Sequence, residues 1–289
     1  MSKFFRILRI NQWYKNLMIF LPLFFSQNIF NILYLQKTVI GLISLCLISS
    51  SYYIINDIVD KKKDSTHSEK KKRPIASGEI RVYQGLIISM ILFFISLTLA
   101  YSLSQMFVFF VLALFGLSML YTFWLKRELF ADILLISVNF VLRGLAGAYV
   151  ISPGIRPYIE ISPWLILCPF FLALFLATGK RRAEQIFLGN KSKKYNALLA
   201  KYDATLLNSM MTISTTLFII SYSLYSFLSR YSLLLLTLPF ALYTILRYYS
   251  LIEQGSVVAR NTEKALKDIR LLIGSGLWVL SVFLIIYLN

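Results

Sequence analysis

The sequence predicts an all-α integral membrane protein with about nine transmembrane helices. Two observations carry this prediction. Hydrophobic residues make up 58% of the 289 residues and charged residues only 15%, a balance too apolar for a soluble protein of this length. The charged residues also gather in a few clusters that separate long apolar stretches, and an apolar stretch of roughly 20 residues is what a helix needs to cross a bilayer.

Nine stretches are predicted to span the membrane, within one domain that covers residues 1–289. In chain order they are residues 17–31, 39–56, 84–102, 106–124, 130–150, 162–179, 205–228, 231–249 and 270–288. Several lie near the lower length limit for a span. The first is interrupted by Pro22 and Asn28. Its aromatic and polar start, with no small-residue cleavage site, is not that of a cleavable signal peptide.

The formal net charge of +17 is explained by topology, so no nucleic-acid partner is expected. With the N-terminus in the cytoplasm, nine spans leave only Lys37, Arg156 and Arg230 on the far side of the membrane, in agreement with the positive-inside rule. We therefore expect a multi-pass protein of the plasma (inner) membrane. The long polar connections 57–83 and 180–204 fall on the cytoplasmic side, and function is expected on these loops.

Three aspartates follow the second predicted span at a helical spacing. Asp57, Asp60 and Asp64 are related as i, i+3 and i+7, which points all three carboxylates the same way on a helix. Such a cluster at the mouth of a membrane helix is costly without a cation, and Mg²⁺ prefers oxygen ligands and often bridges to substrate phosphates. The alternative is an ordinary helix end whose aspartates pair with lysines 61–63.

Basic residues near this cluster are candidates for binding phosphate. Arg73 lies on a loop containing Pro and Gly, which could fold over a phosphate as a lid. Gly78 gives that loop its backbone freedom. Lys126 ends the fourth span and is either a topology marker or a phosphate ligand, and Tyr121 could line the same cavity.

Arg143 is a basic residue inside a predicted span, and an intramembrane arginine is a functional candidate by default. Asp132 lies on the same predicted helix, eleven residues earlier, or some 16 Å along the axis. The two residues are therefore expected to find separate partners, and a bound phosphate would suit Arg143.

Two further clusters lie at membrane boundaries. Lys180, Arg181 and Arg182 follow the sixth span and are either snorkelling anchors or an anion site. Glu184 could pair with Lys180, or reach a metal or a ribose hydroxyl. Lys15, within the amide- and aromatic-rich segment 11–16, is either part of an interfacial anchor or a ligand for a lipid phosphate.

At these residues the chain resembles the UbiA superfamily of intramembrane prenyltransferases. Residues 56–64, with the pattern Asn-Asp-x-x-Asp-x-x-x-Asp, and the loop 72–78 match its first aspartate-rich motif and the loop that follows. The resemblance implies a helical bundle around a cavity open to the cytoplasm and the lipid. Most of the superfamily carries a second aspartate-rich motif after the sixth span, where this chain has residues 179–184 without an aspartate.

This departure is similar to one branch, the decaprenyl-phosphate phosphoribosyltransferases. Further stretches that resemble the branch are 11–16, 141–148, 162–165, 202–207 and the pair 247–248. The resemblance implies Mg²⁺-dependent transfer of 5-phosphoribosyl from phosphoribosyl diphosphate to a polyprenyl (decaprenyl) phosphate, with release of pyrophosphate. It would be a glycosyltransferase step that supplies an arabinose donor for the cell wall. The acceptor phosphate is already ionised near neutral pH, so no general base is required.

The resemblance also implies roles for single residues. Asp57 and Asp60 would bind Mg²⁺, with Asp64 as an outer or second-metal ligand, and Asn56 would bond the diphosphate or the ribose. Catalysis would be positioning and charge stabilisation, by Asp57, Asp60, Lys126 and Arg143. The other substrate-binding candidates are Lys15 for the lipid phosphate, Arg73, Tyr121, Glu184 and Tyr202 around the donor, and Lys180, Arg181 and Arg182 for its 5-phosphate.

Two other functions stay open. One is an ordinary prenyltransferase that moves a polyprenyl group from its diphosphate to an aromatic or other acceptor, against which the missing second aspartate motif counts. The other is a lipid-binding or transport protein without chemistry, against which the polar residues on one face count, since a transporter places some at the midplane. The oligomeric state also stays open: a homo-oligomer is possible, but the sequence shows no clear small-residue interface.

Overall fold

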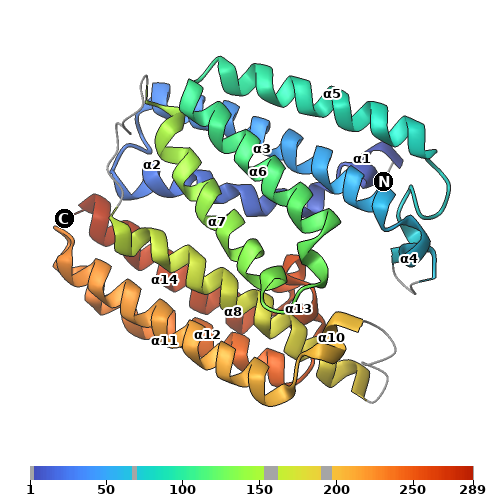
Figure 1. Ribbon diagram of the computed structural model, residues 1–289. Helices are drawn as coiled ribbons and strands as arrows, with labels where there is room; N and C mark the ends of the chain where they lie inside the picture. The colour runs from blue at the N-terminus through green and yellow to red at the C-terminus, as the bar shows by residue number, and fades with distance from the viewer. Residues whose placement is uncertain (1–2, 67–69, 153–161, 190–196, 289) are drawn as a thin grey trace. The chain divides into compact units, whose positions relative to one another are not determined.

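A computed structural model describes residues 3–66, 70–152, 162–189 and 197–288. All regular secondary structure in these residues is helical, which confirms the predicted fold class (Figure 1). Eight helices are long and apolar enough to cross a membrane. They coincide with the last eight predicted spans, while the expected cavity and its orientation stay predictions. Arg156, which the sequence places on the far side of the membrane, lies outside the described residues.

The predicted first span, residues 17–31, is not one regular helix of membrane length, so its crossing of the membrane stays a prediction. The 3₁₀ helix η1 (Ile10–Phe20) runs into the short helix α2 (Leu21–Phe25), in which Pro22 occupies the first turn. The chain then turns at Gln27, whose φ is +60°. Asn31 caps the next helix, α3 (Ile32–Val59), by accepting from the amides of Leu33 and Tyr34. Residues 32–38, which separate the first two predicted spans, therefore belong to α3.

Contacts divide the chain into two units, and the division falls within helix α7. The first unit contains Met1–Lys126 and Leu142–Glu160, and the second contains Arg127–Val141 and Ile161–Asn289. The remaining helices of the first unit are α1 (Lys3–Ile7), α4 (Lys61–Ser65), η2 (Lys70–Lys72), α5 (Val82–Tyr101), α6 (Gln105–Phe123), most of η3 (Leu125–Arg127) and the end of α7 (Ala131–Val150).

Helix α3 is the centre of the first unit and packs along α5, α6 and η1. Two reciprocal serine pairs join α3 to the antiparallel α5: Ser44 with Ser96, and Ser51 with Ser89. In each pair both hydroxyls bond the carbonyl of the opposite residue. Small polar residues let membrane helices approach closely and bond across the interface.

Replacing Ser89 by Leu is expected to lower the free energy of unfolding by about 1–3 kcal/mol. The larger side chain would meet Ser51 at a position that is 2% exposed, and the hydrogen bonds to α3 would be lost. Thermal unfolding of the purified protein in detergent measures the effect. Ile87→Leu on the same helix is the matched control, because Ile87 is 54% exposed. Equal midpoints for the two variants would contradict this packing.

The last turns of α3 are covered by the N-terminal helix α1 and the loop that follows η2. Ile7 of α1 and Ile75 and Ile80 of the loop form one buried cluster with Ile54 of α3. Gly78 in this loop has a φ of +82°, a conformation that other residues adopt at a cost. This small core holds two basic segments, around Arg9 and Arg73, against the aspartate-bearing end of α3.

The second unit is built on α8 (Pro163–Leu188), which packs along α11 (Ala204–Leu228) and α12 (Leu238–Glu253). Its other helices are α10 (Ala197–Lys201), η5 (Ser232–Thr237), α13 (Val257–Arg260), η6 (Thr262–Lys267), α14 (Ile269–Leu288) and the start of α7. The buried residues Phe175, Met211 and Ile252 belong to its main core. In this unit α14 packs along α12 (Figure 1).

An ion pair fixes the start of α14. The carboxylate of Asp268 accepts from Arg247 Nη2 at 2.6 Å, Arg247 Nε at 3.1 Å and the Leu271 amide at 2.8 Å. The hydrogen bond from Arg247 is the main cause that lowers the pKa of Asp268 below its ordinary value of 3.8. A lowered pKa means that the contribution to stability is present above the ordinary value and is lost as the pH falls through the folded-state pKa.

We therefore expect Asp268→Asn to lower the unfolding midpoint at neutral pH and to have a shrinking effect below pH 3.8. The measurement is the midpoint of both proteins from neutral pH to about pH 3. Asp203→Asn serves as the control, because Asp203 is exposed and lies in the same unit. A difference that grows on acidification would contradict the sign of the shift.

Candidate functional site

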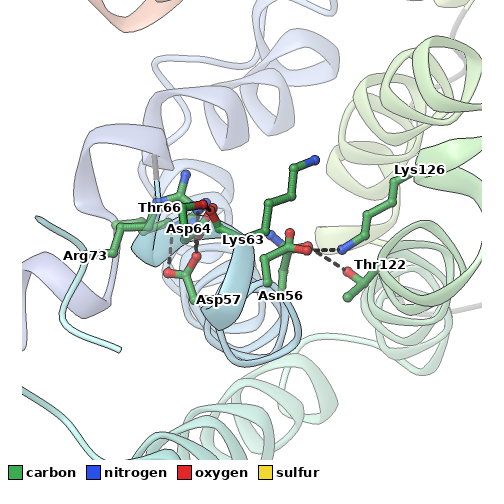
Figure 2. A network of polar contacts seen from close by, with 10 residues as sticks. Asn56, Asp57, Lys63, Asp64, Thr66, Arg73, Thr122 and Lys126 are labelled. Carbon is green, nitrogen blue, oxygen red and sulfur yellow. Dashed lines mark hydrogen bonds and ion pairs between the residues drawn. The ribbon is translucent and has the colours of Figure 1, made fainter. Parts of the chain in front are cut away.

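The three predicted aspartates lie on an almost unbroken helical path at the end of α3. The Asp60 amide donates to the Asn56 carbonyl at 2.9 Å, and the Asp64 amide, in α4, donates to the Asp60 carbonyl at 2.8 Å. Asp57 and Asp64 are 3% and 2% exposed. The spacing in the sequence thus becomes a cluster of carboxylates at one helix end, as Figure 2 shows for Asp57 and Asp64.

Two arginines hold the buried carboxylates. Arg73 Nη1 lies 3.0 Å from Asp57 Oδ1 and 2.5 Å from Asp64 Oδ2, between the two side chains (Figure 2). Arg9 also binds Asp57 with two nitrogens: Nε lies 3.1 Å from Oδ2, and Nη2 contacts Oδ1. The Arg9 guanidinium stacks over the Tyr53 ring at 5.1 Å. Arg9 has a φ of +51°, so its backbone is strained in the position that reaches Asp57.

Asp60, the remaining aspartate, faces the end of α6. Lys126 Nζ lies 2.6 Å from Asp60 Oδ1, and the Thr122 hydroxyl donates to Asn56 Oδ1 at 3.4 Å (Figure 2). The cations that meet the aspartates in the described structure are therefore Arg9, Arg73 and Lys126. Lysines 61–63, the alternative partners that the sequence suggested, do not take part in these ion pairs.

The fit of this cluster to a divalent cation follows from its donors. No three acidic, histidine or cysteine side chains in the described residues already form a metal-binding group. The Arg73 guanidinium instead lies between Asp57 and Asp64 and forms an ion pair with each of them. Carboxylate and amide oxygens are the ligands that Mg²⁺ prefers. The residues fit such an ion on the condition that Arg73 moves aside.

Arg143 lies in a second polar cluster of the first unit. Its Nε donates to Asn16 Oδ1 at 2.7 Å and its Nη2 donates to the Tyr52 hydroxyl at 2.7 Å. The Ser49 hydroxyl links the other two, since it donates to Asn16 Oδ1 and accepts from Tyr52. The Tyr52 and Tyr53 rings contact each other at 4.7 Å. A chain of contacts thus runs from Arg143 to the tyrosine beneath Arg9.

Asp132 is the centre of a polar cluster in the second unit and is fully buried. Its Oδ2 accepts from Arg181 Nη2 at 3.0 Å and Nε at 3.2 Å, and its Oδ1 accepts from the Tyr202 hydroxyl at 2.6 Å. Burial, and then the hydrogen bond to Asp132, raise the pKa of Tyr202. Arg143 and Asp132 have separate partners, as their spacing predicted.

The remaining predicted site residues have the following contacts and exposure. Arg181 Nη1 lies 3.8 Å from Glu184 Oε2, whereas the sequence suggested Lys180 as the partner of Glu184. Arg182 lies 3.7 Å from Glu253 on α12. Lys180 and Tyr121 are half-buried on α8 and α6. Lys15 lies over the Tyr14 ring at 6.0 Å.

Arg9, Thr122 and Tyr52 are among the residues of these clusters that were not predicted from the sequence as site residues. Arg9 reads in the sequence as one more basic residue of the cytoplasmic side. Thr122 and Tyr52 are polar residues within apolar stretches, where a partner across the interface is the usual explanation. The periodicity of polar residues could have singled out Tyr52, because Ser49 precedes it by three residues on α3. No sequence pattern distinguishes Arg9.

A bundle of membrane-length helices with clustered acidic and basic side chains at one helix end is typical of an intramembrane enzyme. The chain belongs to the UbiA prenyltransferase family, whose model matches residues 18–266, and it is a transferase of that family.

Two curated relatives and one solved structure illustrate the similarity. The chain is 29% identical to the decaprenyl-phosphate phosphoribosyltransferase of Mycolicibacterium smegmatis, over 78% of this chain and 70% of that one. It is 32% identical to the enzyme of the same name from Corynebacterium glutamicum, over 78% and 68% of the two chains. A UbiA homologue from Archaeoglobus fulgidus, solved with DMAPP and Mg²⁺, has the same fold, with a TM-score of 0.74, 19% identity and full coverage of both chains.

Proposed function

We propose that the protein transfers the 5-phosphoribosyl group from phosphoribosyl diphosphate to a polyprenyl phosphate such as decaprenyl phosphate. An oxygen of the lipid phosphate forms a bond to C1 of the ribose, and the bond from C1 to pyrophosphate breaks with its electron pair on the leaving group. The lipid phosphate is already an anion at neutral pH, so the reaction needs no general base. The names of the relatives with 29% and 32% identity support this reaction.

One observation carries the proposal: the end of α3 combines three carboxylates with three cations. Arg9, Arg73 and Lys126 contact the aspartates and can bind phosphate oxygens, and Asn56 supplies an amide beside them. Asp57, Asp60 and Asp64 would hold Mg²⁺, in line with the Mg²⁺ in the homologue from A. fulgidus. When bound, the ion would neutralise charge on the leaving pyrophosphate.

The roles of the other candidate residues remain part of the proposal. A phosphate contact by Arg143 requires that it gives up a hydrogen bond to Asn16 or Tyr52. The 5-phosphate is assigned to Lys180, Arg181 and Arg182, of which Arg181 is engaged by Asp132. Lys15 is assigned to the lipid phosphate, and Tyr121, Glu184 and Tyr202 to the ribose pocket.

The location is also a proposal. We expect one membrane domain in the plasma membrane, with the N-terminus and the loops of the site in the cytoplasm, where phosphoribosyl diphosphate is available. The lipid substrate would reach the protein from within the bilayer.

A turnover assay on the purified protein in detergent tests the reaction. One sample contains Mg²⁺, a polyprenyl phosphate and radiolabelled phosphoribosyl diphosphate, and the other contains Mg²⁺, a prenyl diphosphate and a phenolic acid. Label that moves into the lipid phase in the first sample alone is the expected result. Product in the second sample alone would contradict the proposal and establish a conventional prenyltransferase.

A further inference from the structure

Residues 254–268 connect two membrane-length helices of the second unit, so they lie at one boundary of the bilayer. They join the end of α12 to the start of α14 and contain the short helices α13 and η6. The first half of this connection is packed, because Val258 and Ala259 belong to the main core of the unit. Arg260 also lies over the Phe187 ring, 3.5 Å from its centre, near the end of α8. Helix η6 is therefore held beside the start of α14.

One side of α14 is apolar and exposed along the helix. Its exposed residues are Ile269, Ile273, Leu277, Leu280 and Leu284. Intervals of three and four residues place them on one helix face. The helix has 20 residues, or about 30 Å, which matches the thickness of the hydrocarbon core. This face therefore suits contact with lipid chains, and its first residue lies at the edge of the hydrocarbon.

The apolar series continues beyond the start of α14. Leu266 of η6, three residues before Ile269, is 75% exposed, and Ile269 itself is 66% exposed. Contact of such side chains with water is unfavourable. A segment that lies in the membrane interface instead buries them among the acyl chains. The exposure of Leu266 thus indicates that η6 lies at the surface of the membrane.

Three basic residues accompany these apolar side chains. They are Lys264, Lys267 and Arg270, which together form the basic strip. None of them forms an ion pair within the part of the chain that the structure describes. Asp268, which lies between them in the sequence, is bound by Arg247. With Glu263 as the other acidic residue of the segment, the strip keeps an excess of positive charge.

Anionic phospholipid headgroups match both properties of this surface. Lysine and arginine side chains at the membrane boundary extend to the headgroups while their stems contact acyl chains, and the attraction of anionic lipid adds up over neighbouring basic residues. A soluble acidic partner would match the charges alone. It would not match Leu266 and Ile269, which continue the lipid-facing side of α14.

From these observations we infer that the basic strip, with Leu266 and Ile269, is a binding surface for anionic phospholipid headgroups at the membrane boundary beside α14. The surface belongs to the second unit, whereas the aspartate cluster belongs to the first. The inference therefore does not depend on the proposed reaction.

Lipid titration in uncharged detergent micelles, followed by native mass spectrometry, tests the inference. Phosphatidylglycerol and phosphatidylcholine with the same acyl chains are compared. The wild type is expected to bind the anionic lipid more tightly, with a preference that falls as the salt concentration rises. The triple variant Lys264→Gln, Lys267→Gln and Arg270→Gln is expected to bind phosphatidylglycerol on the order of 100-fold more weakly, from roughly fivefold per basic residue. Its affinity for phosphatidylcholine is expected to stay unchanged.

Two further variants separate the contributions of position, charge and apolar contact. The triple variant Lys62→Gln, Lys71→Gln and Lys72→Gln removes three exposed cations of the first unit and is expected to bind phosphatidylglycerol as the wild type does. Leu266→Gln is expected to weaken the binding of both lipids by a similar factor, because it removes an apolar contact and no charge. None of the substituted residues is buried, so all three proteins are expected to unfold at the midpoint of the wild type.

Three results would overturn the inference. The first is a wild-type affinity for phosphatidylglycerol in the variant that lacks the basic strip. The second is an equal loss of affinity in both triple variants, which would assign the preference to the net charge of the protein. The third is a Leu266→Gln variant that binds both lipids as the wild type does, since the surface would then have no apolar part.

Discussion

Replacing Asp57 by Asn is expected to lower kcat/KM by roughly 10³-fold or more while the protein remains folded. Asp57 is the aspartate that both Arg9 and Arg73 contact. The change removes a proposed metal ligand and the shared anionic partner of two arginines, but the amide keeps the shape of the side chain. The measurement is the rate of label transfer to the lipid, together with size-exclusion behaviour and the unfolding midpoint in detergent.

The control for this prediction is Asp203→Asn, which removes a carboxylate that is exposed to solvent. It is expected to leave both the rate and the midpoint unchanged. An Asp57→Asn enzyme that keeps its full Mg²⁺-dependent rate would refute the assignment of Asp57 to the metal. A variant that fails to fold would be replaced by Asp57→Glu, which retains the charge but moves it by one methylene and is expected to be strongly impaired.

Replacing Asp132 by Ala is expected to lower the free energy of unfolding by about 3–5 kcal/mol. The carboxylate is fully buried and holds Arg181 and Tyr202. Its removal takes away the carboxylate that lies 3.0 Å from Arg181 and leaves Glu184 at 3.8 Å, and the loss of one member of a buried ion pair is strongly destabilising. Thermal unfolding in detergent measures the loss.

The matched variants for Asp132 identify the cause. Tyr202→Phe removes one hydrogen bond and no charge, so about 1–3 kcal/mol is expected. The double variant Asp132→Leu with Arg181→Met removes both charges and is expected to recover much of the loss. If the double variant were as unstable as Asp132→Ala, the effect would come from lost packing and not from the broken ion pair.

The stability and turnover experiments also distinguish the functions of the cluster around Asp57 and the cluster around Asp132. The cluster around Asp57 contains the charges that are proposed to bind substrate, and its loss is expected to change the rate more than the stability. The cluster around Asp132 ties the start of α7 to α8 and to Tyr202, just before α11, and its loss is expected to change stability first. Opposite results at the two sites would reverse these roles.

Most of the fold could be predicted from the sequence because hydrophobicity is a local property of membrane helices. Eight of the predicted spans coincide with helices of the required length and composition. The irregular helical structure of the segment 17–31 could not be predicted, because it depends on the proline-containing turn of α2 and on the left-handed conformation of Gln27. The apolar composition of that segment is the same with or without such a break.

Less of the site could be predicted. The spacing of Asp57, Asp60 and Asp64 placed all three at one helix end, since a helix repeats every 3.6 residues. Their partners differ, because Asp57 and Asp64 share Arg73 while Asp60 contacts Lys126. The prediction that Arg143 and Asp132 have separate partners also needed only helix geometry. The identity of those partners, Asn16 and Tyr52 in one case and Arg181 and Tyr202 in the other, required the packing of helices from distant parts of the chain.

The sequence by itself determined that the protein lies in a membrane, that it is helical, and that three carboxylates share one helix end, because these properties follow from residues that are neighbours along the chain. Only the tertiary structure decided which cations meet those carboxylates. Arg9 reaches Asp57 across 48 residues of sequence and Lys126 reaches Asp60 across 66. Such contacts depend on how α1, α3 and α6 pack, and packing is set by the fit of whole helix surfaces, which no local pattern contains.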